Sequence, residues 1–88
     1  MIAGRDHQRL TRAAATLERE AGRPVLATPA DIARPEDCEA MVEAAANRFG
    51  ALDILVNNAA HFALAPLLDA TGEEALRFFG PNLFGPLQ

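Results

Sequence analysis

The chain has 88 residues and a net charge of −4 at pH 7, with half of its residues hydrophobic and 23% charged. This length allows at most one domain, and the composition excludes a disordered chain. The acidic balance without a basic run argues against a nucleic-acid partner, and no apolar stretch approaches the roughly 20 residues that cross a bilayer. We therefore expect one globular domain located in the cytoplasm.

Rare and missing residue types limit the chemistry further. Cys38 is the only cysteine, and the two histidines, His7 and His61, lie far apart in the sequence, so we expect neither a disulfide framework nor a metal site. The sequence contains no Ser, Tyr, Lys or Trp. Any reaction that needs those side chains must take them from outside these residues.

The first part of the chain predicts a strand, a helix and a second strand. Met1 to Ala3 is a short apolar run that predicts the end of a strand. Apolar residues then recur at three- and four-residue spacing over 7–21, which predicts an amphipathic helix with Asp6 as its N-cap and Gly22 after its last turn. A second short strand is expected over 25–28.

The next part predicts another helix and another strand. Pro35 suits the first position of a helix over 35–49, and Gly50 suits its end. Residues 52–56 form an apolar run that predicts a strand buried on both faces. The helix over 35–49 should bury an apolar stripe, which consists of Cys38, Met41, Val42, Ala45 and Phe49.

A third helix is predicted close to the end of the chain. Thr71 and Glu74 have the spacing of a capping box, which starts a helix. Gly80-Pro81 should kink or break that helix because proline removes one backbone hydrogen bond and crowds the preceding turn. Helical patterns that alternate with short apolar runs indicate the α/β class.

Several motifs resemble, in order and spacing, the short-chain dehydrogenase/reductase family. The most specific is the run from Phe49 to Ala60, and the others are Ala3-Gly4-Arg5, Asp31-Ile32 and Asn82-Leu83-Phe84-Gly85. The resemblance extends over essentially the whole chain. It implies an internal fragment of such a protein, in which residues 1–88 form an incomplete NAD(P)-binding domain.

The implied fold is a partial Rossmann-like, doubly wound parallel sheet with the second to fourth strands of the family and without its first. The strands near Ile2 and Leu26 should then pair in parallel. The helices at 7–21 and 35–49 should cover opposite faces, because parallel crossovers are right-handed. Beside 52–56 we expect an empty slot or a closure against the Met1 edge.

The resemblance also implies which residues border a nicotinamide dinucleotide. Asn57 would tie neighbouring strands together, and the backbone of Asn58, Ala59 and Ala60 would border the two riboses. Ala60 stands where the family usually has glycine, so either its backbone angles are ordinary or the local fit is altered. The alternative interpretation of the segment is a strand-to-loop turn rich in small residues.

Two further positions bear on the choice of cofactor. Arg5 follows the second strand of the family, where a cation favours the 2′-phosphate of NADP(H) over NAD, and Arg9 could add a second positive charge. Asp31 and Ile32 match the pair that contacts adenine. The alternatives are that both arginines are solvated surface residues and that Asp31 is simply an acid in the loop before Pro35.

Asn82 matches the asparagine of the family's proton-relay tetrad, and the alternative is a polar residue after a helix break. The family's glycine-rich turn and its Tyr, Lys and Ser are absent, so this chain alone is expected to be inactive. The parent protein would be a homo-oligomeric oxidoreductase that transfers hydride between NADP(H) and a small alcohol or carbonyl compound. The alternatives are a non-catalytic nucleotide-binding or interaction module and a non-functional truncated product.

Overall fold

The computed structural model describes residues 1–62, 64 and 66–88. Two strands and two helices alternate first, and helical turns around a third helix follow. These elements are β1 (Ile2–Gly4), α1 (His7–Ala21), β2 (Ala27–Pro29), α2 (Pro35–Phe49), the 3-10 turn η1 (Leu67–Asp69), α3 (Gly72–Phe79), the π-helical turn η2 (Gly80–Phe84) and the 3-10 turn η3 (Gly85–Leu87).

The strands β1 and β2 pair in parallel, as the sequence predicts, with Ile2 opposite Ala27 and Gly4 opposite Pro29. Backbone hydrogen bonds extend the pairing beyond the strand ends: the Ile2 amide donates to the Leu26 carbonyl at 2.8 Å, and the Ala30 amide donates to the Gly4 carbonyl at 3.1 Å. The prediction of a parallel pair is confirmed, with the second strand beginning two residues later than expected.

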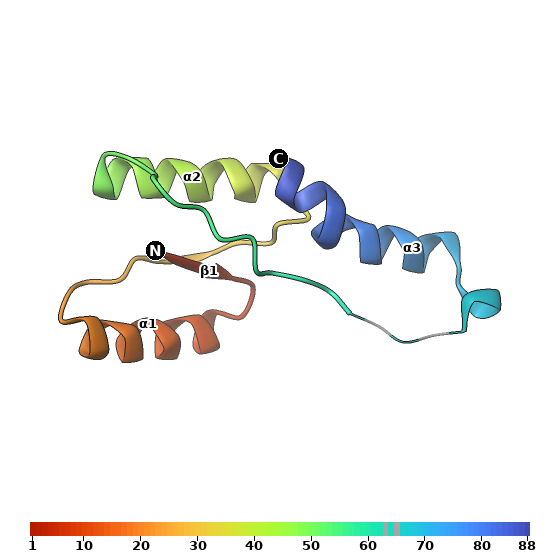
Figure 1. The fold of residues 1–88 in the computed structure, drawn as a ribbon, viewed down its shortest axis with the longest axis horizontal. Coiled ribbons are helices and arrows are strands. Elements are labelled where there is room, and N and C mark those ends of the chain that lie inside the picture. Colours follow the sequence, from red (N-terminus) through yellow and green to blue (C-terminus); the bar gives the residue numbers. More distant parts are fainter. Residues whose placement is uncertain (63, 65) are drawn as a thin grey trace.

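Helices α1 and α2 lie on opposite sides of this strand pair, as Figure 1 shows. Helix α1 contacts both strands. The arrangement confirms the prediction from the right-handed crossover rule. It places the carboxyl ends of both strands, with the loops that follow them, at one edge of the sheet.

The predicted helix boundaries are confirmed by their capping geometry. The Asp6 carboxylate accepts a hydrogen bond from the Arg9 amide at 2.9 Å, which satisfies one free donor of the first turn of α1. Gly22 and Gly50 end the two helices in the left-handed conformation, with φ of 66° and 82°. Pro35 occupies the start of α2, where a missing N–H costs nothing.

The prediction of a buried strand over 52–56 is wrong. The segment forms no strand and pairs with no other segment in the described part of the chain. Its side chains are exposed, with Ile54 at 79% and Val56 at 77%. A strand needs a neighbour for its backbone hydrogen bonds, and the segment has none beside it. Between it and β1 lies a cavity of about 490 Å³, where the slot was expected.

The C-terminal helix begins and ends where the sequence predicts, and the chain then continues as a helical turn of another kind. Thr71 and Glu74 form both hydrogen bonds of the capping box at the start of α3. The α-helix ends at Phe79, directly before Gly80-Pro81, as predicted, but the chain continues as the π-helical turn η2, where the Gly85 amide donates to the Gly80 carbonyl. Pro81 has no amide hydrogen to continue the α-helical pattern, and the wider turn, with its hydrogen bond over five residues, carries the chain past it.

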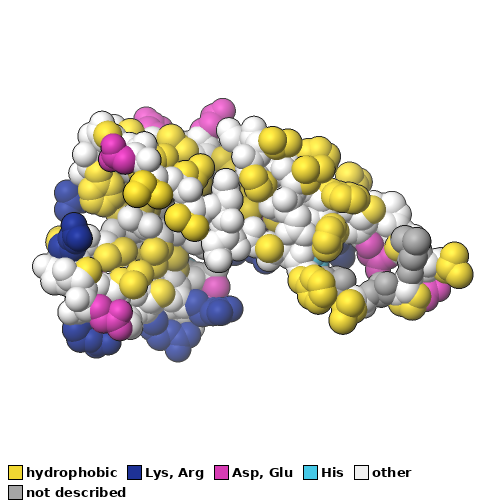
Figure 2. Space-filling view, viewed as in Figure 1, with side chains coloured by type: hydrophobic (Ala, Val, Ile, Leu, Met, Phe, Trp, Pro, Cys, Tyr) yellow, Lys and Arg dark blue, Asp and Glu magenta, His cyan; other side chains and the backbone are white. Residues whose placement is uncertain are grey.

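The chain exposes much more surface than a compact monomer. Its accessible area is 6990 Å², against about 5,000 Å² expected for a folded protein of this mass. Hydrophobic side chains are spread along the part that projects beyond the strand pair (Figure 2). The buried apolar residues of the described chain all precede residue 51, and they are Leu10, Ala14, Ala30, Cys38 and Ala45.

The expected apolar stripe of α2 is only partly buried. Cys38 and Ala45 are covered, whereas Val42 and Phe49 remain 45% and 49% exposed. Met41 and Val42 instead line the cavity, because the neighbouring segment does not close against the sheet. No helix in the described ranges is long and apolar enough to cross a membrane.

Candidate functional site

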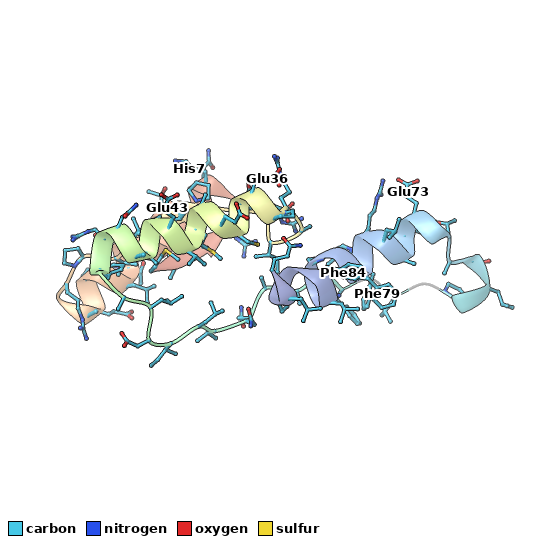
Figure 3. The ribbon with its side chains drawn as sticks, turned by 90° about the horizontal axis from the view of Figure 1, so that it is seen from above. His7, Glu36, Glu43, Glu73, Phe79 and Phe84 are labelled. Atoms are coloured by element: carbon cyan, nitrogen blue, oxygen red, sulfur yellow. The ribbon has the colours of Figure 1, made fainter. Side chains whose placement is uncertain are left out.

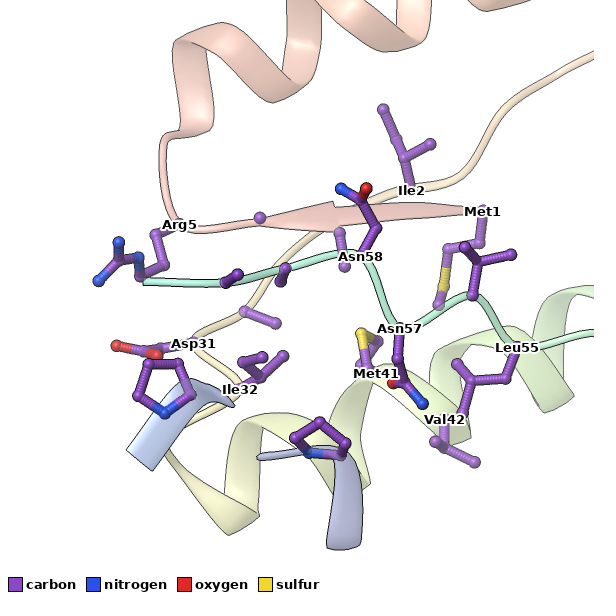
Figure 4. A pocket seen from close by; sticks show the side chains of 18 of the residues that line it. Met1, Ile2, Arg5, Asp31, Ile32, Met41, Val42, Leu55, Asn57 and Asn58 are labelled. Atoms are coloured by element: carbon purple, nitrogen blue, oxygen red, sulfur yellow. The ribbon is translucent and has the colours of Figure 1, made fainter. Parts of the chain in front are cut away.

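One cavity gathers the loops at the carboxyl ends of the strands (Figure 4). Its walls come from residues 1–5, from the turn after β2, from the extended segment before residue 61, and from α2. Every residue that the sequence predicts to bind a cofactor lines this cavity. These residues are Arg5, Asp31, Ile32, Asn57, Asn58, Ala59 and Ala60.

Arg5 and Asp31 lie at the same end of the cavity, with Ile32 next to Asp31 (Figure 4). Asp6, the acid beside Arg5, is engaged elsewhere because its carboxylate caps α1. Arg5 forms no ion pair with any residue that the structure describes. Its guanidinium is therefore available to an external anion.

The turn after β2 holds Asp31 in a defined position. One carboxylate oxygen, Oδ1, accepts a hydrogen bond from the Ala33 amide at 3.0 Å, and the Asp31 carbonyl accepts from the Arg34 amide at 2.9 Å. The other carboxylate oxygen has no hydrogen-bond donor within the described residues. That oxygen is free to accept a hydrogen bond from a ligand.

The extended segment presents a small-residue surface to the cavity. Asn57 and Asn58 point to opposite sides of it (Figure 4), and the Asn58 amide donates to the Val56 carbonyl at 3.1 Å. No described residue other than glycine has a positive φ, so Ala60 adopts ordinary backbone angles. Of the two alternatives for Ala60, ordinary backbone angles or an altered local fit, the structure shows ordinary backbone angles.

Asn82 lies in the π-helical turn η2 and fastens the end of the extended segment. Its Oδ1 accepts from the His61 amide at 2.7 Å, and its Nδ2 donates to the His61 carbonyl at 2.7 Å. Asn82 itself does not line the cavity, whereas its neighbour Pro81 and its partner His61 do. The side chain is thus part of a paired contact between two elements, rather than a free polar group after a helix break.

Three side chains at the start of α2 have pKa values that are shifted by their immediate neighbours or by burial. A hydrogen bond from its own backbone amide, aided by one from Arg34, lowers the pKa of Glu36, and the same contact raises the pKa of Arg34. Burial raises the pKa of the Cys38 thiol, so this cysteine remains protonated and unreactive near neutral pH. The described residues contain no cluster of three or more potential metal ligands.

Comparison with known proteins identifies the family. A sequence model described as short chain dehydrogenase matches residues 1–88, the whole chain. The chain belongs to this family. It is 39% identical over 87 residues to galactitol 2-dehydrogenase from Agrobacterium fabrum, covering 99% of this chain and 32% of that protein. It is 36% identical over 69 residues to a diacetyl reductase from Staphylococcus epidermidis, covering 78% of this chain and 27% of the relative.

Solved structures of dehydrogenases and reductases share the fold. The L-sorbose reductase from Gluconobacter frateurii, complexed with NADPH and L-sorbose, superimposes with a TM-score of 0.90 at 32% identity, over 97% of this chain and 32% of that one. An alcohol dehydrogenase from the archaeon Thermococcus sibiricus, complexed with 5-hydroxy-NADP, gives 0.87 at 29% identity, over 94% and 35%. This short chain dehydrogenase sequence thus spans about a third of the length of the proteins it matches.

Some residues that shape the site were not predicted from the sequence. Asp37 accepts a hydrogen bond from the Asp31 amide, and Gly85 packs directly on the Ile32 carbonyl. Asp37 carries a weak sequence signal, since acids in a first helical turn have a general explanation in the helix dipole. Gly85 belongs to the motif that begins at Asn82, but only the packing reveals what it touches.

Proposed function

We propose that this chain is the middle part of the cofactor domain of an NADP(H)-dependent oxidoreductase. The parent protein would oxidise an alcohol or reduce a carbonyl compound. The observation that carries the proposal is the gathering of Arg5, Asp31, Ile32 and the 57–60 segment around one cavity. Support also comes from relatives that are named reductases or dehydrogenases, two of which were solved with NADPH or an NADP derivative.

The residues present fit the adenine half of such a cofactor. Arg5, at one end of the cavity, would bind the 2′-phosphate through charge-assisted hydrogen bonds. The free Asp31 oxygen would accept from the adenine amino group, and Ile32 would pack on the ring. Only Arg5 bears on the choice of cofactor, because NAD and NADP carry the same adenine and differ in the 2′-phosphate; since Arg5 forms no ion pair with a described residue, NADP(H) is the better match than NAD.

The extended segment would border the rest of the cofactor. The small side chains of Ala59 and Ala60 would let the riboses approach the backbone, and Asn57 would tie this segment to its neighbours. Asn82 would keep the end of the segment in place through its paired hydrogen bonds to His61. When bound, the nicotinamide ring supplies or accepts the hydride.

The proton-transfer side chains are not part of this chain. The family's tyrosine, lysine and serine, like its glycine-rich turn for the pyrophosphate, have no counterpart in the sequence. We therefore propose that these 88 residues bind NADP(H) weakly and do not catalyse turnover alone. An assay for alcohol-dependent reduction of NADP⁺ by the isolated chain should show no activity, and measurable turnover would contradict the assignment.

The Arg5→Ala substitution tests the cofactor assignment in the complete protein. We expect NADPH binding to weaken by about 1.5 to 3 kcal/mol, because a charge-assisted contact to the 2′-phosphate is lost. NADH binding should hardly change. Titration of both cofactors measures the difference, with Arg12→Ala on the exposed side of α1 as the matched control. An equal loss for NADPH and NADH would exclude a role for Arg5 in selecting NADP(H).

A further inference from the structure

The turn that carries Asp31 and Ile32 is held by α2 on one side. The Asp37 carboxylate, in the first turn of that helix, accepts a hydrogen bond from the Asp31 amide at 2.8 Å through Oδ2. This contact is partly buried, and the Asp37 side chain is only 30% exposed. The other oxygen of Asp37 lies 3.8 Å from Nε of Arg34, a longer and more exposed contact. The bond to Asp31 is therefore the stronger of the two.

The same turn also packs against the C-terminal region. Gly85, at the junction of η2 and η3, is buried, and a Cβ atom on it would lie 2.7 Å from the Ile32 carbonyl oxygen. That distance is too short for any real contact, so a side chain at residue 85 would displace the turn or the helix. The Ile32 carbonyl also accepts a weak hydrogen bond from the Cys38 thiol at 3.7 Å.

Gly85 is present for space rather than for its backbone angles. Its φ of −53° and ψ of −52° are ordinary helical values that every residue can adopt. An alanine at this position would even favour a helical turn by intrinsic propensity. The effect of adding a methyl group here is therefore a direct measure of the contact with Ile32.

We propose that Asp37 and Gly85 are positioning residues for the adenine end of the cofactor site. Asp37 fixes the Asp31 peptide from α2, and Gly85 leaves the room that the Ile32 carbonyl occupies against the C-terminal helical turn. Together they set where the Asp31 carboxylate and the Ile32 side chain stand relative to Arg5. The proposal rests on the proposed function and adds to it residues that touch no cofactor atom but decide its adenine affinity.

If Asp37 acted only as a negative charge at the helix start, its substitutions would have different effects from those that the positioning role predicts. A dipole or ion-pair role depends on the negative charge, whereas a positioning role depends on an acceptor oxygen. Asp37→Asn keeps the oxygen and removes the charge, and Asp37→Ala removes both. Glu36→Ala is the matched control, because Glu36 also pairs with Arg34, at 2.6 Å, but does not touch Asp31.

The first experiment measures binding of adenosine 2′-monophosphate to the 88-residue chain by NMR titration. This probe carries the adenine, ribose and 2′-phosphate and does not require the missing pyrophosphate loop. We expect Asp37→Ala to weaken binding about tenfold, as the loss of one hydrogen bond to a charged group would. The affinity of Asp37→Asn for the probe should stay within about threefold of that of the unsubstituted 88-residue chain, and Glu36→Ala should bind the probe as tightly as the unsubstituted chain.

The second experiment compares Gly85→Ala with Gly72→Ala by the same titration. Gly72 lies at the start of α3, and a Cβ atom there would meet no atom within 4 Å. We expect Gly85→Ala to weaken binding of adenosine 2′-monophosphate about tenfold or more, and Gly72→Ala to leave it unchanged. The α1 resonances report whether each variant is folded, and hence whether its affinity can be interpreted.

Amide hydrogen exchange separates failure of this proposal from failure of the proposed function. With no ligand present, the Asp31 amide should exchange faster in Asp37→Ala than in the unsubstituted 88-residue chain or in Asp37→Asn. Unchanged exchange, or unchanged affinity in Asp37→Ala and Gly85→Ala, would overturn the positioning proposal. If the Asp31 amide of the unsubstituted 88-residue chain is protected from exchange but the chain does not bind the probe, the cofactor assignment itself is overturned, and the positioning proposal with it.

Discussion

The first 50 residues and the last 38 form two regions that use similar sequence signals with different results. In the N-terminal unit, residues 1–50, each helix covers one side of the β1–β2 pair and contributes buried side chains. In the C-terminal arm, residues 51–88, helix α3 contributes no buried residue. Leu76 on α3 is 69% exposed, and Ile54 in the extended segment is 79% exposed.

Helix α3 is nevertheless well formed and amphipathic. Figure 3 shows Phe79 and Phe84 directed away from the side that carries Glu73. Its start is satisfied by the capping box between Thr71 and Glu74, and Arg77 pairs with Glu73 at 2.6 Å one turn away. A helix closes its hydrogen bonds within itself, so these local contacts suffice to shape it.

The segment 52–56 lacks that possibility. It is as apolar as a buried strand, but a strand completes its hydrogen bonds only with a neighbour. Local sequence signals therefore decide which segments become helical, whereas burial and strand formation depend on what lies beside a segment.

The largest expected difference between the two regions concerns the loss of an apolar side chain. Leu10 is 7% exposed and packs near Gly4 of β1, so Leu10→Ala should lower the free energy of unfolding by about 3 kcal/mol. Ile54→Ala is the matched control in the arm and should change it by less than about 0.5 kcal/mol. Chemical denaturation followed by circular dichroism measures both. Similar losses for the two variants would show that the arm is packed as tightly as the N-terminal unit.

Removal of a helix cap should destabilise the protein less than the loss of Leu10. The loss should affect the whole N-terminal unit when the cap of α1 is removed, but only the helix itself when the cap of α3 is removed. Removing either cap, by Asp6→Ala or Thr71→Ala, should cost about 1 kcal/mol locally. Asp6→Ala should lower the unfolding midpoint of the N-terminal unit because α1 packs on both strands. Thr71→Ala should fray α3 alone, visible in its NMR chemical shifts. A lower midpoint in Thr71→Ala would reveal coupling between α3 and the strand pair.

The smallest expected effect is a dependence of α3 on pH. Hydrogen bonds from the Thr71 amide, and then from its hydroxyl, lower the pKa of Glu74. Because the pKa is lower in the folded state, ionised Glu74 stabilises the helix start above the ordinary glutamate value of about 4.3. This stabilisation should be lost as the pH falls through the lowered pKa. NMR titration of α3 measures it, and Glu74→Gln should abolish the dependence while keeping an acceptor oxygen.

The sequence by itself determined the elements whose hydrogen bonds are local. Asp6 and Gly22 bound α1 as predicted, Pro35 and Gly50 bound α2, and Thr71 starts α3, because caps act within a few residues. The candidate cofactor residues that the family motifs single out all line one cavity, since the carboxyl ends of parallel strands share one edge of a sheet, and their role in binding stays a prediction.

Only the tertiary structure decided the outcomes that depend on distant neighbours. Residues 52–56 stay extended and exposed because no described strand pairs with them, although their sequence is typical of a buried strand. The α-helix ends at Phe79 but the chain continues as a wider π-helical turn, which brings Asn82 to His61 and Gly85 to Ile32, pairs that are far apart in the sequence. Spacing along the sequence cannot reveal such contacts, because they are set by how whole elements pack and by the room left between their backbones.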